Sequence, residues 1–170
     1  LLYQLLARDG ATVANYRMGV GLTGTTNASA WANQIGAAGP LLQATGGNQP
    51  SIQADGSLLF DGIAHFMIVT IALAQPITVY FVGKQITWTA TDSIFDGLVG
   101  NTLRLFQSNT TPNISQSATI IGATANTNNN LALNTYGVVQ AVFNGAGSSI
   151  KVDSNAAISG GNPGSDSPTG

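Results

Sequence analysis

The sequence contains no cysteine and no glutamate, and it has a single histidine, His65. The absence of cysteine excludes a disulfide framework, thiolate chemistry and cysteine-ligated zinc or iron–sulfur sites. A single histidine excludes a site with several histidine ligands, and a Ser-His-Asp triad would depend on His65 alone. We therefore expect no metal centre and no cofactor.

Charged residues are also scarce. They make up 7% of the 170 residues, against roughly 25% in an ordinary soluble domain. The formal net charge of −2 is too weak and too mixed to bind nucleic acid through its phosphates. The length is that of one domain.

One uncharged stretch, Phe66–Gly83, approaches the length of a membrane-spanning helix. Gln75-Pro76 interrupts it, and its second half is rich in β-branched and aromatic residues. We expect two buried strands joined by a turn, with no insertion into a membrane.

Glycine, threonine, asparagine and serine are abundant, with 21, 18, 15 and 13 residues respectively. These residue types are middling to poor helix formers. Short apolar runs with turn residues between them are typical of an all-β sandwich. We predict strands at residues 13–20, 57–60, 65–71, 77–87, 93–95, 103–107, 113–121, 136–143, 148–153 and 156–158.

Four local patterns refine this prediction. Asp61-Gly62 favours a tight hairpin between the strands on either side of it. Ile77–Thr87 is apolar on both faces and is expected at the centre of a sheet. Leu1–Arg8 alone has helical spacing, so a short helix or an extension that packs on a neighbour is expected there. The polar segment Thr124–Asn134 is expected to be a loop.

The order of several segments resembles the concanavalin-A-like (laminin-G-like) jelly-roll domains. Trp31-Ala32-Asn33-Gln34-Ile35-Gly36 is similar to the opening motif of that family, and Leu59-Phe60-Asp61-Gly62 to the strand that follows. Gln75–Val82 is similar to its central strand, and Leu133–Gly145 to the paired strand of the other sheet. Such domains are common in bacteriophage tail and particle-surface proteins and in bacterial extracellular proteins. The resemblance covers about residues 12–158.

The resemblance implies an antiparallel jelly-roll β-sandwich over residues 12–159, preceded by the extension or short helix at 1–11. The family normally ends with two further strands, whereas residues 160–170 are a Gly/Ser/Pro-rich loop. We therefore expect a jelly roll that is incomplete at its C-terminus, with the chain continuing or another chain filling the gap. The acidic calcium-binding cluster of lectin-like members is not recognisable.

The ionisable residues do not form a pattern typical of an enzyme. The aspartates show no close spacing that would place two on one strand face, and a glycosidase needs two facing carboxylates. Asp61 and Asp96 each precede glycine and are expected to form turns. His65 is expected to cap a turn or face solvent at the edge of a strand.

A sugar-binding surface is the remaining candidate for a site. Trp31 lies in the opening motif and is expected in the core. Trp88 enters a polar loop at the rim of the sandwich, and asparagine amides in a loop could hydrogen-bond sugar hydroxyls. The candidate ligand-binding residues are Trp88, Asp92, Asn128, Asn129 and Asn130, with half-buried packing and a plain exposed loop as the alternatives.

The resemblance implies a non-enzymatic structural or adhesion protein of a virion, at the surface of a phage tail or capsid. Its expected partners are other copies of itself, other virion proteins and a host cell-surface glycan. The alternative is an extracellular carbohydrate-binding module of a bacterial protein. An aspartate-based carbohydrate-active enzyme is the third hypothesis.

Overall fold

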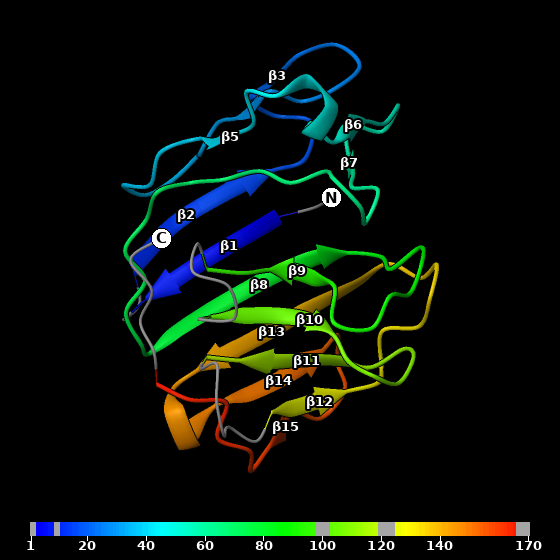
Figure 1. The fold of residues 1–170 in the computed structure, drawn as a ribbon. Coiled ribbons are helices and arrows are strands. Elements are labelled where there is room, and N and C mark those ends of the chain that lie inside the picture. The colour runs from blue at the N-terminus through cyan, green and yellow to red at the C-terminus, as the bar shows by residue number, and fades with distance from the viewer. Residues whose placement is uncertain (1–2, 9–10, 98–102, 119–124, 166–170) are drawn as a thin grey trace.

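The computed structural model describes residues 3–8, 11–97, 103–118 and 125–165. These residues form antiparallel sheets, and the two largest pack face to face as a β-sandwich (Figure 1). Apart from strands, the described elements are two three-residue 3-10 turns, η1 (Gly46–Asn48) and η2 (Gly145–Gly147). The prediction of an all-β antiparallel sandwich is confirmed.

The larger sheet has six strands in the order β15-β14-β13-β8-β1-β2. Its centre is the pair β8 and β13, which are in register from Gly83↔Gly137 to Ile77↔Phe143. β8 also pairs with β1 on its other side, so the central position predicted from its apolar faces is confirmed. The strands are β1 (Tyr3–Arg8), β2 (Ala11–Arg17), β8 (Ile77–Gly83), β13 (Gly137–Phe143), β14 (Ser149–Val152) and β15 (Ile158–Ser159).

The second sheet has four strands in the order β12-β11-β10-β9 and covers one face of the first (Figure 1). Apolar side chains from both sheets fill the space between them, and each fully buried large one stabilises the fold by roughly 1.5–3 kcal/mol. Phe143, Ile77 and Val139 come from the first sheet, and Leu105 and Ile114 from the second. The strands are β9 (Ser93–Phe95), β10 (Arg104–Gln107), β11 (Ile114–Ser117) and β12 (Asn126–Asn128).

Amide side chains join the two sheets where β12 passes over β14. Asn126 donates through Nδ2 to the carbonyl of Ser148 at 3.0 Å, and Asn128 to that of Ile150 at 3.3 Å. Gln116 of β11 donates to the carbonyl of Val142 at 3.2 Å. All three amides are buried. Each places a hydrogen bond between a side chain of the four-stranded sheet and the main chain of the six-stranded sheet or of the turn before β14.

Residues 18–70 form a lobe of small sheets at one end of the sandwich (Figure 1). The three-stranded sheet contains β3 (Leu22–Thr23), β4 (Ala30–Trp31) and β5 (Leu41–Leu42). A second hairpin joins β6 (Ser51–Ile52) to β7 (Leu58–Leu59). Trp31 packs against the core, tilted at 5.8 Å from the Tyr16 ring, and its indole N–H donates to the carbonyl of Arg17.

The prediction of a short helix at Leu1–Arg8 is wrong, because Tyr3–Arg8 is strand β1. β1 pairs with β2 on one side and with β8 on the other, so this segment lies inside the sheet of its own chain. An isolated helix of eight residues is marginal in water, whereas each paired strand supplies a ladder of main-chain hydrogen bonds. Tertiary pairing therefore overrides the local spacing.

The prediction of a hairpin across Asp61-Gly62 is also wrong. β7, which precedes this dipeptide, pairs with β6, whereas the chain after it forms an isolated bridge between Ile68 and Leu42. Of the two strands expected within Phe66–Gly83, only the second, β8, forms. No helix in the described part of the chain is long and apolar enough to cross a membrane.

The expected loop at Thr124–Asn134 contains β12, and the C-terminal segment lies beside it. Gly161 donates its main-chain N–H to Oδ1 of Asn126 at 2.9 Å. Ala118 donates to the carbonyl of Pro163 at 2.6 Å. The described part of the C-terminal loop therefore packs against this edge of the four-stranded sheet.

Candidate functional site

The predicted sugar-binding residues occupy two separate places. Trp88 and Asp92 lie in the segment that leads into β9, where Gln107 of β10 donates its main-chain N–H to the carbonyl of Asp92. Asn128 is in β12, at the opposite edge of the four-stranded sheet. With β10 and β11 between these edges, the separation is about 14 Å at the usual spacing of strands. The structure does not bring the five residues together.

Asn128 cannot offer its amide to a ligand in this structure. Its side chain is 1% exposed. Its Nδ2 donates to the carbonyl of Ile150, and its Oδ1 accepts the main-chain N–H of Asn130. Asn129 and Asn130 are exposed at the turn that follows, while Trp88 and Asp92 are partly buried.

Asp61 forms the turn predicted for it, although the turn does not close a hairpin. Its Oδ1 accepts the main-chain N–H groups of Ile63, Ala64 and His65 at 2.9–3.0 Å. These hydrogen bonds, led by the one from His65, lower the pKa of Asp61 to about 2. His65 folds back so that its Nε2 lies 3.7 Å from Oδ2 of Asp61, and His65 and Asp92 line one open pocket of about 410 Å³.

Asp96 lies close to a cation and a hydroxyl. Its Oδ2 accepts from the Ser93 hydroxyl at 3.2 Å and lies 3.8 Å from Nε of Arg104. Among the residues that the structure describes, no group of three or more histidine and aspartate side chains is placed to hold a metal ion.

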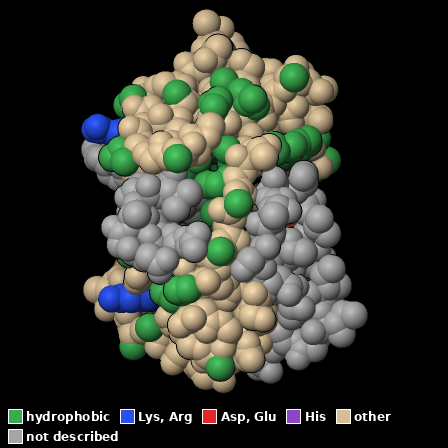
Figure 2. All heavy atoms as spheres, turned by 90° about the vertical axis from the view of Figure 1, so that its left-hand side faces the viewer, with side chains coloured by type: hydrophobic (Ala, Val, Ile, Leu, Met, Phe, Trp, Pro, Cys, Tyr) green, Lys and Arg blue, Asp and Glu red, His purple; other side chains and the backbone are tan. Residues whose placement is uncertain are grey.

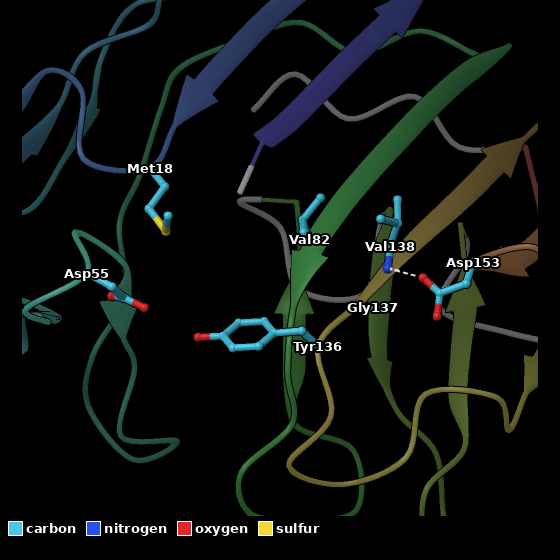
Figure 3. Close-up of a pocket in the computed structure, with 7 residues that line it drawn as sticks. All are labelled: Met18, Asp55, Val82, Tyr136, Gly137, Val138 and Asp153. Carbon is cyan, nitrogen blue, oxygen red and sulfur yellow. Dashed lines mark hydrogen bonds between the residues drawn. The ribbon is translucent and has the colours of Figure 1, made fainter. Parts of the chain in front are cut away.

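A second hollow lies on the outer face of the six-stranded sheet, and we call it the Tyr136 groove. Its volume is about 330 Å³. Figure 3 shows Asp55 on one side, Asp153 on the other, and the Tyr136 ring pointing from the sheet toward Asp55. Its lining residues are Met18, Asp55, Val82, Tyr136, Gly137, Val138 and Asp153.

The apolar floor of the Tyr136 groove follows from strand alternation. Val82 of β8 and Val138 of β13 are direct partners in the register, and both point away from the core. Val138 is 41% exposed and Tyr136 50% exposed. The sequence showed that the β8 segment is apolar on both faces, but it could not show which valines remain exposed to solvent.

Asp153 is held at one end of the groove by the main chain. Its Oδ1 accepts the N–H of Val138 at 2.8 Å, and its backbone has φ of +50°, a region that aspartate tolerates better than most residues. A Cβ on Gly137 would lie 3.0 Å from Oδ2 of Asp153 and 2.6 Å from Leu131 Cδ1. An alanine at 137 would therefore force the buried Leu131 side chain and the Asp153 carboxylate to shift.

Asp55 stands at the other end, on the turn between β6 and β7. Its Oδ1 accepts the main-chain N–H of Ser57 at 2.9 Å. Hydrogen bonds from Ser57 hold the pKa of Asp55 below its usual value, so this carboxylate is ionised at neutral pH. Beside the groove, the ammonium of Lys84 lies 5.0 Å from the centre of the Tyr136 ring.

A third feature is an exposed apolar patch at the edge of the small three-stranded sheet, made by Leu42, Ile68 and Phe66, which we call the Leu42 face. Thr23, Ala30 and Leu42 are successive register partners across β3, β4 and β5. Leu42 in turn exchanges main-chain hydrogen bonds with Ile68 at 2.7 and 2.9 Å. Leu42 is 52% exposed, and Ile68 and Phe66 are each 44% exposed.

The Leu42 face belongs to a part of the surface with little charge. Figure 2 shows hydrophobic side chains gathered over the small-sheet lobe, with few charged side chains beside them. The opposite side of the same sheet carries Trp31 and Leu41, which pack against the core. The small sheet is thus apolar on both sides, but only one side is covered within the chain.

No family model, curated protein or solved structure matches the chain. The resemblance to concanavalin-A-like domains therefore stays a prediction, and the geometry of the described residues carries the functional argument.

Proposed function

We propose that this protein is a non-enzymatic structural or adhesion component of a particle surface, of the kind found on phage tails and capsids. The observation that carries the proposal is the Leu42 face. Three large exposed apolar side chains, Leu42, Ile68 and Phe66, on a charge-poor lobe are suited to burial against another chain. The resemblance drawn from the sequence supports the same function.

The proposal assigns the two parts of the molecule different roles. The sandwich is a rigid body, held by its apolar core and by amide hydrogen bonds between the sheets. The small-sheet lobe presents Leu42, Ile68 and Phe66 for assembly with further copies of the chain or with other particle proteins. Such an assembly depends on the burial of apolar surface and is insensitive to salt.

The test is the native mass of the protein, measured by light scattering and native mass spectrometry over a range of concentrations. We expect an oligomer that the double substitution Leu42→Ser/Ile68→Ser converts to a monomer. Ile158→Ser is the matched control, because Ile158 is 40% exposed on the far edge strand β15. A wild-type chain that stays monomeric at all concentrations, without binding a particle protein, would refute the proposal.

A further inference from the structure

We propose that the Tyr136 groove is a docking site for one basic side chain of a partner polypeptide, with arginine preferred over lysine. The inference is independent of the assembly proposal, because the groove and the Leu42 face share no residue. It is carried by three features of the groove: its charge, its apolar floor and its aromatic wall.

The charge of the groove favours a single cation. Asp55 and Asp153 stand at opposite ends (Figure 3), and neither takes part in the described ion pairs, His65–Asp61 and Arg104–Asp96. The ammonium of Lys84, which lies beside the Tyr136 ring, also acts electrostatically on Asp55 and compensates one of the two carboxylates. One net negative charge remains, and one incoming cation balances it.

Both carboxylates are already oriented. Each has Oδ1 held by a main-chain N–H, from Ser57 for Asp55 and from Val138 for Asp153. Because the main chain fixes these side chains, little rotamer entropy is lost when the Oδ2 atoms accept a further hydrogen bond. A charged donor gains more from such acceptors than a neutral hydroxyl does.

The floor and wall suit the rest of a basic side chain. Val82, Val138 and Met18 offer apolar contact to an aliphatic stem, as long basic side chains require. The Tyr136 ring already holds one cation over its face, at 5.0 Å from Lys84 Nζ. A guanidinium stacks on such a ring better than an ammonium and is more weakly hydrated, which favours arginine.

The experiment is a titration of the isotope-labelled 170-residue chain, followed by its amide NMR signals. The probe is the capped tripeptide acetyl-Gly-Arg-Gly-amide, and its neutral isostere with citrulline in place of arginine is the comparison. We expect saturable shifts of the Val138 and Gly137 amide signals for the arginine peptide only, with a millimolar Kd. The Kd should rise when the salt concentration is raised from 0.05 to 0.5 M, because salt screens exposed charges and the Debye length is already about 10 Å at 0.1 M.

Variants test the two carboxylates. Asp153→Asn and Asp55→Asn each keep the Oδ1 acceptor that the main chain uses, and asparagine also tolerates positive φ at 153. We expect each to raise the Kd about two- to fivefold, the effect of an exposed ion pair. Asp92→Asn, which changes the net charge equally but lies in the other pocket, is the control and is expected to leave the Kd unchanged.

Equal binding of the citrulline peptide would overturn the inference, and so would shifts that Asp153→Asn leaves unaltered. Maltotriose and chitotriose are included as neutral sugar probes. If either shifts the same amide signals while the arginine peptide does not, the groove is a glycan site and the inference is wrong. The native mass is unaffected by any of these outcomes, so failure here is distinguishable from failure of the assembly proposal.

Discussion

Removal of the Asn126 side chain tests whether the buried amides hold the two sheets together. Asn126 is 2% exposed, donates to the Ser148 carbonyl at 3.0 Å and accepts the Gly161 N–H at 2.9 Å. Asn126→Ala removes two hydrogen bonds and leaves two main-chain groups unpaired. At about 1–3 kcal/mol for each unsatisfied buried group, the free energy of unfolding should fall by roughly 2–6 kcal/mol.

The assay is urea unfolding followed by tryptophan fluorescence and circular dichroism. In thermal unfolding of a chain of this length, each kcal/mol of lost stability lowers the Tm by roughly 2–4 °C. Asn129→Ala is the matched control, since Asn129 is exposed three residues along the chain and should change the unfolding free energy by less than about 0.5 kcal/mol. If Asn126→Ala unfolds with the wild-type midpoint and slope, the amides do not join the sheets as argued.

Three further predictions concern individual sites. Gly137→Ala should destabilise the fold by about 1–3 kcal/mol in urea unfolding because the new methyl group has no room, whereas Gly39→Ala, which meets nothing within 4 Å, should be near neutral. The folded-state pKa of Asp61, about 2, lies below its unfolded value, so its stabilisation is present above pH about 4 and is lost as the pH falls toward 2. As the pH falls from 5 to about 2, the Asp61→Asn variant should therefore lose less stability than wild type does. The measurement is the urea midpoint of both proteins at each pH. Burial raises the pKa of Tyr16 to about 12, so its contribution to the free energy of unfolding is present below pH about 10 and is lost as the pH rises from there toward 12. Tyr16→Phe should abolish that part of the loss of stability at alkaline pH. An ultraviolet titration that the substitution leaves unchanged would contradict the assignment.

Much of the sandwich could be predicted from local pattern. β9, β10, β13 and β14 form within the segments predicted as strands, and β8 lies at the centre of its sheet. These strands contain apolar or alternating residues bounded by turn residues, so their own side chains specify both their conformation and their burial. Asp61 is similar, because its side chain caps the turn that it begins.

The candidate sites could not be predicted in the same way. The sequence favoured Trp88 and the asparagine tract, but the fold buries Asn128 under β14 and places Asp92 across the sheet. The Tyr136 groove joins Asp55 to residues about 80 and 100 positions further on, at Tyr136 and Asp153. Only the packing of the small-sheet lobe beside the sandwich creates that juxtaposition.

The sequence by itself determined that the protein is built from antiparallel strands, since its composition disfavours helices and its apolar runs have the length of strands. Tertiary structure alone decided that Tyr3–Arg8 joins the main sheet and that buried asparagines carry main-chain hydrogen bonds between sheets. It also decided which apolar side chains stay exposed, at the Leu42 face and in the Tyr136 groove. The physical reason is that strand conformation depends on neighbouring residues, whereas pairing and burial depend on partners that are distant in the chain.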